Sequence, residues 1–145
     1  MSSRDGLLLY VEDNPDHAEL VLRTLGRHHP RDNIHHLEDG EAALDYLRRC
    51  ETGSVPRPVL ILLDLRLPKV DGLEVLRTVK STPDLATIPV VVLSTSSSEE
   101  DMSSAYEHHV NSYVVKPDTY PQLDQLMQHL GAYWMEWNQV AIEGA

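Results

Sequence analysis

Three apolar runs of this 145-residue sequence each end in charged residues. The runs cover residues 7–11, 59–63 and 113–115. The charged residues that follow them are Glu12 and Asp13, Asp64, and Lys116. Continuous apolar runs are typical of strands in a parallel sheet that is covered on both faces. Because such sheets bind ligands outside the carboxyl ends of their strands, we expect three carboxylates and one ammonium group to meet at one edge.

A cluster of Glu12, Asp13 and Asp64 would offer only oxygen ligands, which hard divalent cations prefer. The cluster therefore indicates a Mg²⁺ site, with Mn²⁺ as a substitute. An isolated Glu-Asp pair is more often two solvated loop acids, but Asp64 on a separate strand end favours the metal site. Opposite these carboxylates, Lys116 would supply a fixed cation for an anionic group on Asp64.

Hydroxyl side chains follow a further apolar run at residues 90–93. Ser94 continues that strand directly, and Thr95 is next to it. A hydroxyl at the strand end is suited to hydrogen bonding with a phosphoryl oxygen. A serine run by itself also fits ordinary loop and capping chemistry, so the run alone leaves both interpretations open.

Apolar runs and helical patterns alternate five times along the chain. The sequence predicts strands at 7–11, 33–37, 59–64, 90–94 and 112–115. It predicts helices at 15–26, 40–50, 72–80, 99–109 and 120–141. This alternation predicts an α/β fold, a doubly wound five-stranded parallel sheet flanked by five helices, the last of them extended.

The sequence resembles the receiver domain of two-component response regulators. The resemblance covers about residues 5–130 and rests on motifs in this order: Leu9-Tyr10-Val11-Glu12-Asp13-Asn14, Leu63-Asp64-Leu65-Arg66-Leu67-Pro68-Lys69-Val70-Asp71-Gly72, Leu93-Ser94-Thr95 and Tyr113-Val114-Val115-Lys116-Pro117. It implies a flavodoxin-like sheet of strand order 2-1-3-4-5. It also implies a protein that a sensor histidine kinase phosphorylates and that is not a turnover enzyme.

The resemblance also implies roles for individual residues. Asp64 would be the phosphoacceptor, and Asp13 the direct metal ligand of the acidic pair that it forms with Glu12. The backbone carbonyl of Arg66 would be a further metal ligand. Ser94 would be the conserved hydroxyl, with Thr95 as the alternative if the loop is altered. The remaining implied roles are those of Lys116, the conserved lysine, and Tyr113, the aromatic switch residue.

Within this family, the sequence is most similar to regulators that are paired with bacterial phytochrome histidine kinases. The supporting stretches are residues 39–47, 99–101 and 104–113, together with an aromatic C-terminal segment. That segment contains Tyr133, Trp134 and Trp137 and continues past the usual end of the family's last helix. Because exposed aromatic clusters mark interfaces, we expect a homodimer built on residues 99–109, 112–115 and 120–141.

Composition excludes several other classes of protein. The net charge of −11 argues against a nucleic-acid surface, and no segment approaches the length of a membrane span. The single cysteine, Cys50, suits a reducing cytosol, so we expect a cytoplasmic protein. We expect one receiver domain over residues 1–145, with a core of about 5–130, a helical extension of 131–145, and no output domain.

Two rival functions are a metal-dependent phosphohydrolase and a non-catalytic nucleotide or flavin binder. A phosphohydrolase that works through an aspartyl phosphate usually has a second acid two residues after its nucleophile, where this chain has Arg66. A nucleotide or flavin binder needs a phosphate loop rich in Gly, Ser or Thr after the first strand. Here the acidic residues Glu12 and Asp13 occupy that position.

Overall fold

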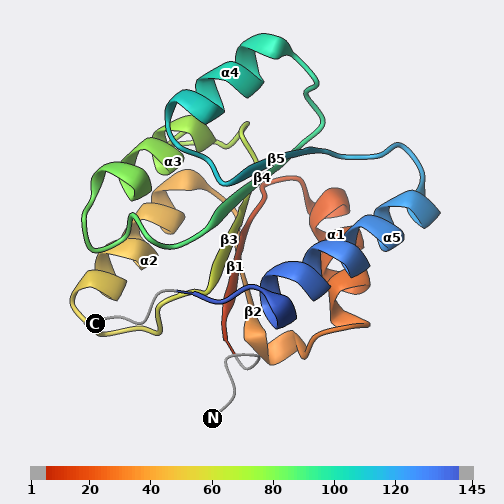
Figure 1. Cartoon of the computed structure of the whole chain (residues 1–145), viewed down its shortest axis with the longest axis horizontal. Helices are drawn as coiled ribbons and strands as arrows, with labels where there is room; N and C mark the ends of the chain where they lie inside the picture. The colour runs from red at the N-terminus through yellow and green to blue at the C-terminus, as the bar shows by residue number, and fades with distance from the viewer. Residues whose placement is uncertain (1–5, 141–145) are drawn as a thin grey trace.

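The computed structural model describes residues 6–140, which form one parallel sheet with helices on both faces (Figure 1). The strands are β1 (Leu8–Val11), β2 (Ile34–Leu37), β3 (Leu60–Leu63), β4 (Val90–Ser94) and β5 (Ser112–Val115). They lie in the order β2-β1-β3-β4-β5. The α-helices are α1 (Pro15–Gly26), α2 (Gly40–Glu51), α3 (Gly72–Ser81), α4 (Glu99–Glu107) and α5 (Tyr120–Gly131). The predicted doubly wound fold and strand order are confirmed.

The sheet separates two hydrophobic cores because successive side chains of a strand point to opposite faces. Leu9 and Val11 of β1 pack on the face that α2, α3 and α4 cover. Leu8 and Tyr10 pack on the other face, against α1 and α5. The strands β1, β3 and β4 are buried along their whole length, as their uninterrupted apolar sequences predict.

Side-chain caps fix where the helices next to the sheet edge begin. Asn14 Oδ1 accepts hydrogen bonds from the backbone N–H groups of Asp16 and His17 at the start of α1, at 2.9 and 3.2 Å. Ser98 caps α4 in the same way, and Thr119 caps α5. These caps satisfy N–H groups that have no partner within the helix, so each helix starts directly after its strand-end loop.

The C-terminal segment departs from the continuous α-helix predicted for residues 120–141. α5 ends at Gly131, and residues Ala132–Trp137 form a π-helical turn, η3. The extra residue per turn shifts the apolar stripe, so that Met135 is buried while Trp137 is 77% exposed. Tyr133 is also exposed and meets Trp134 edge to face at 5.1 Å between ring centroids. Residues 141–145 of the predicted extension lie outside the described residues.

The helices of the structure are too short or too polar to span a membrane. Between residues 6 and 140, no helix combines the length and the apolar character needed to cross a bilayer.

Candidate functional site at the carboxyl edge of the sheet

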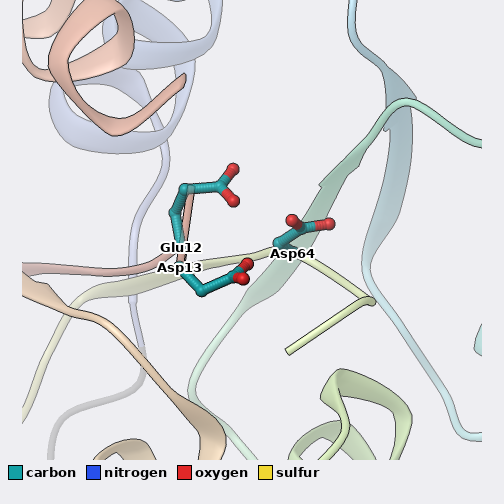
Figure 2. A group of neighbouring side chains, drawn as sticks. All are labelled: Glu12, Asp13 and Asp64. Atoms are coloured by element: carbon teal, nitrogen blue, oxygen red, sulfur yellow. The ribbon is translucent and has the colours of Figure 1, made fainter. Parts of the chain in front are cut away.

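The three predicted acidic residues meet at the carboxyl edge of the sheet. β1 and β3 are paired neighbours with Val11 opposite Leu63, so the residues that follow them emerge side by side. Carboxylate oxygens of Glu12, Asp13 and Asp64 lie within 4.8 Å of one another. Figure 2 shows the side chains of Glu12 and Asp13 extending from the end of β1 toward Asp64. The sequence-based prediction of one converging cluster agrees with this geometry.

The three carboxylates differ in burial, which sets their electrostatics. Glu12 is 1% exposed, Asp64 is partly buried and Asp13 is exposed. Burial and the neighbouring Glu12 carboxylate raise the pKa of Asp64 to about 7. Burial alone would also raise the pKa of Glu12, but hydrogen bonding with Asp64 and Lys116 outweighs burial and lowers it. A divalent cation among these oxygens would relieve the repulsion, so the donor set fits Mg²⁺ or Mn²⁺.

Lys116 directly follows β5, and its side chain reaches Glu12 at the end of β1. Its Nζ lies 2.5 Å from Glu12 Oε1 in an ion pair whose side chains are 8% and 1% exposed. The same Nζ lies 3.1 Å from Nδ1 of His17 in the first turn of α1. The structure therefore brings Lys116 to the acidic cluster, as predicted, and its ammonium group contacts Glu12 and His17.

The two hydroxyl candidates at the end of β4 lie in different environments. Ser94 is 1% exposed, and its Oγ accepts a hydrogen bond from the backbone N–H of Ser96 at 3.1 Å. Its carbonyl accepts from the N–H of Lys116 at 2.7 Å, which ties the ends of β4 and β5 together. Thr95 is exposed and lines a cavity beside Lys116.

Tyr113 of β5 packs partly buried against the core on the α3 and α4 side. Its hydroxyl donates a hydrogen bond to the carbonyl oxygen of Ser96 at 2.9 Å. The ring is therefore held by the same β4–α4 loop that contacts Ser94. This arrangement gives a direct route by which a movement of the loop changes the environment of Tyr113.

The loop after β3 holds Asp64 against the start of α3. The backbone N–H of Arg66 faces Asp64 Oδ1 at 3.5 Å, and its side chain contacts Asp101 of α4 at 2.8 Å. Gly72 begins α3 so close to the strand end that a Cβ there would lie 2.2 Å from the carbonyl oxygen of Asp64. Only glycine permits this approach, and it keeps the Asp64 loop compact.

Sequence reasoning missed two residues of this site. His17 contacts Lys116, and Asp101 contacts both Arg66 and Ser96. The signal for His17 was its place in the first turn of a helix that starts at the strand end. Asp101 lies in the first turn of α4, and nothing local in the sequence pairs it with Arg66.

Comparison with known proteins identifies the family. A family model described as the response regulator receiver domain matches residues 8–128. The chain belongs to the response regulator receiver domain family. Phosphorylation and divalent-metal binding are typical of this family, in agreement with the acidic cluster of the receiver domain described here.

Two curated relatives cover nearly the whole receiver domain. FilR2 of Methanothrix harundinacea, described as a probable methanogenesis regulatory protein, is 48% identical over 133 residues, which span 92% of this chain and 86% of FilR2. The response regulator Rcp1 of Synechocystis sp. is 43% identical over 131 residues, which span 90% of this chain and 89% of Rcp1.

Solved structures are similar to the receiver domain over the same length. Phosphorylated RcpA, a cyanobacterial phytochrome response regulator, superimposes with a TM-score of 0.87 at 39% identity, over 94% of this chain and 99% of RcpA. The Mn²⁺-bound form of Rcp1 superimposes with a TM-score of 0.85 at 40% identity, over 94% of this chain and 99% of Rcp1. The receiver domain is therefore a homologue of phytochrome response regulators.

Proposed function

We propose that Asp64 accepts a phosphoryl group from a sensor histidine kinase. The observation that carries this proposal is the convergence of Glu12, Asp13 and Asp64 within 4.8 Å, with Lys116 beside them at the edge of the sheet. The metal ligands would be Glu12, Asp13, Asp64 and the backbone carbonyl of Arg66. Mg²⁺ is the proposed ion, and the Mn²⁺-bound Rcp1 structure supports Mn²⁺ as a substitute.

The chemistry is an in-line displacement at phosphorus. A carboxylate oxygen of Asp64 forms the new P–O bond while the bond from phosphorus to the leaving nitrogen of a phosphohistidine breaks, and the imidazole leaves with the electron pair. Bound Mg²⁺ would neutralise the charge that gathers among the oxygens. The protein positions its groups for a step that needs little other covalent chemistry. Lys116 is the resident cation that stabilises the phosphoryl oxygens of the product.

The response starts from the hydroxyl of Ser94. We propose that the new phosphoryl oxygens recruit this hydroxyl from its contact with the N–H of Ser96, and that Thr95 takes this role only if the loop rearranges. Movement of the loop would break the bond from Tyr113 to the carbonyl of Ser96 and let the ring turn inward. The result is a population shift on the face formed by α4, β5 and α5.

The proposed partner is a sensor histidine kinase of the bacterial phytochrome type. The similarity to Rcp1 and RcpA over at least 90% of the chain supports this partner. FilR2 is also a close relative, so a histidine kinase of another sensory class is the alternative. Phosphotransfer profiling against the histidine kinases of the source organism distinguishes the two, because only the cognate kinase should transfer rapidly.

We also propose a homodimer on the face of α4, β5 and α5, with Tyr133, Trp134 and Trp137 in its interface. The four large exposed hydrophobic residues within the described part of the chain support it, because each belongs to α4, β5 or η3. They are Tyr106, Val115, Tyr133 and Trp137. A groove that joins β5 to α5 is lined by Val114, Leu126 and Tyr133, among others. Two copies related by a two-fold axis would cover these apolar groups reciprocally.

We propose a single cytoplasmic receiver domain over residues 1–145, which catalyses its own phosphorylation and is not a turnover enzyme on an external substrate. The net charge of −11 supports protein partners rather than nucleic acid or an anionic membrane surface.

Labelling with a small phosphodonor tests the function. The protein is incubated with acetyl phosphate and Mg²⁺, and the phosphoryl content is followed by intact mass. Wild type should reach one phosphoryl group per chain, and Asp64→Asn should stay unlabelled, with the exposed Asp71→Asn as a control that labels normally. Undiminished labelling of Asp64→Asn would contradict the site. Continuous turnover without a stable adduct would indicate a phosphohydrolase. If wild type shows neither labelling nor turnover, the protein is a binding protein.

A further inference from the structure

Two acceptors hold the ammonium group of Lys116. Glu12 Oε1 lies 2.5 Å from Lys116 Nζ, and His17 Nδ1 lies 3.1 Å from it. A lysine ammonium group has three N–H donors and no acceptor, so Nδ1 of His17 must accept. The neutral ring then carries its proton on Nε2. With two N–H groups engaged in this way, the direction of the third is restricted.

The second acceptor matters because Lys116 has room to move. A cavity of about 270 Å³ lies beside it, lined by Val21 of α1, Leu123 of α5 and Asp118, among others. The four-carbon stem of lysine is flexible, and a single ion pair leaves the ammonium group free to turn about that contact. The carboxylate of Asp118 on the cavity wall would attract an ammonium group that is released from His17.

The position of His17 is itself fixed by the start of α1. Asn14 Oδ1 accepts from the backbone N–H of His17, and Pro15 begins the helix with its φ already helical. α1 also packs directly against α5, which follows the Lys116 loop. The imidazole is therefore presented to Lys116 by a capped helix end rather than by a mobile loop.

We propose that His17 is a positioning residue for phosphoryl transfer to Asp64, acting through Lys116. This inference rests on the proposed function of Asp64. His17 keeps the ammonium group of Lys116 on the side of the carboxylate cluster, so that its free N–H faces the incoming phosphoryl oxygens. It touches neither the metal ligands nor the phosphoryl group, and its effect is on the rate of transfer rather than on metal binding.

The test compares two substitutions of similar size. His17→Leu fills the same space without an acceptor, whereas His17→Asn keeps an acceptor close to the position of Nδ1. With acetyl phosphate at saturating Mg²⁺, His17→Leu should slow labelling of Asp64 about 10- to 100-fold, and His17→Asn should recover to within about threefold of wild type. The Kd for Mg²⁺ should be unchanged in both. His28→Leu is the matched control and should label normally, because His28 is exposed and lies just past the end of α1.

A double variant separates positioning from a general structural effect. If His17 acts through Lys116, then His17→Leu should add no further loss in a Lys116→Ala background. Multiplicative losses in the double variant, or equal losses in His17→Leu and His17→Asn, would overturn the inference. A labelled wild type with an equally fast His17→Leu variant would overturn this inference alone, whereas an unlabelled wild type would overturn the proposed function with it.

Discussion

The guanidinium group of Arg66 contacts both carboxylate oxygens of Asp101, at 2.9 and 2.8 Å. This ion pair joins the loop that follows Asp64 to the first turn of α4. Ser96 Oγ donates to the same carboxylate at 2.6 Å, and the Tyr113 hydroxyl donates to the Ser96 carbonyl at 2.9 Å. A continuous series of polar contacts therefore connects the proposed phosphorylation site with α4 and β5.

Removing the ion pair should loosen α4 locally. In Arg66→Ala, we expect amide hydrogen exchange over residues 95–107 to become about two- to fivefold faster, because an exposed ion pair stabilises the elements that it joins only modestly. Arg77→Ala is the control, since Arg77 pairs with Glu74 within α3 and links no two elements. Unchanged exchange over 95–107 in Arg66→Ala would contradict the connection to α4.

The raised pKa of Asp64 predicts a pH-dependent gain in stability for Asp64→Asn. A pKa of about 7 in the folded protein means that ionised Asp64 destabilises the fold increasingly as the pH rises from about 4, with the full effect above about 7. Without metal, the free energy of unfolding of Asp64→Asn should therefore exceed that of wild type by about 1–2 kcal/mol at pH 8, after allowance for the partial exposure of Asp64. At pH 5 the two proteins should differ little.

Urea unfolding in EDTA at both pH values measures this difference. Adding Mg²⁺ at pH 8 should stabilise wild type more than Asp64→Asn, because the ion removes the repulsion that the substitution had already relieved. A gain of equal size at pH 5 and pH 8 would mean that the carboxylate of Asp64 is not the destabilising group.

The metal site predicts that Asp13 contributes to binding without contributing to folding. Asp13 is exposed, so Asp13→Asn should keep wild-type stability in EDTA while its Kd for Mg²⁺ rises at least about tenfold, because a charged ligand is lost. Titration calorimetry measures the Kd. Asp16→Asn, another exposed acid three residues along, is the control and should bind Mg²⁺ normally. Equal affinities of Asp13→Asn and wild type would exclude Asp13 as a ligand.

The two hydroxyls after β4 are expected to differ in function. Ser94→Ala should accept the phosphoryl group but lose the phosphorylation-induced change at Tyr113, because the buried Ser94 hydroxyl holds the loop that binds the Tyr113 hydroxyl. Thr95→Ala should respond like wild type. The NMR signals of the Tyr113 ring before and after labelling report the change. A loss of response in Thr95→Ala alone would reverse the assignment.

The exposed aromatics of η3 allow a test of the dimer without disturbing the core. Tyr133 and Trp137 are 55% and 77% exposed, so replacing both with serine should leave the near-ultraviolet circular dichroism that arises from buried aromatics unchanged. Sedimentation velocity of the full chain should show a dimer for wild type and a weaker one, by at least about tenfold in Kd, for the double variant. A wild type that stays monomeric at high micromolar concentration, with and without phosphorylation, would rule the dimer out.

The α/β fold and the acidic cluster were predictable because both depend on local signals. Apolar runs that end in charged residues identify buried parallel strands, and the carboxyl ends of parallel strands share one edge. Glu12, Asp13 and Asp64 therefore meet whatever the details of the loops. The helix starts at Asn14, Ser98 and Thr119 were predictable for the same reason, since a cap acts over two or three residues.

Other features depend on contacts between segments that are far apart in the sequence. Nothing local pairs Arg66 with Asp101 or His17 with Lys116, because each contact requires two loops or helices to approach at one rotamer of each side chain. The π-helical turn after Gly131 likewise changed which residue continues the apolar stripe, burying Met135 and exposing Trp137. The sequence alone determined the sheet and which charged groups gather at its edge. The tertiary structure decided how those groups are held, because their partners are supplied by the packing of α1 and α4 around that edge.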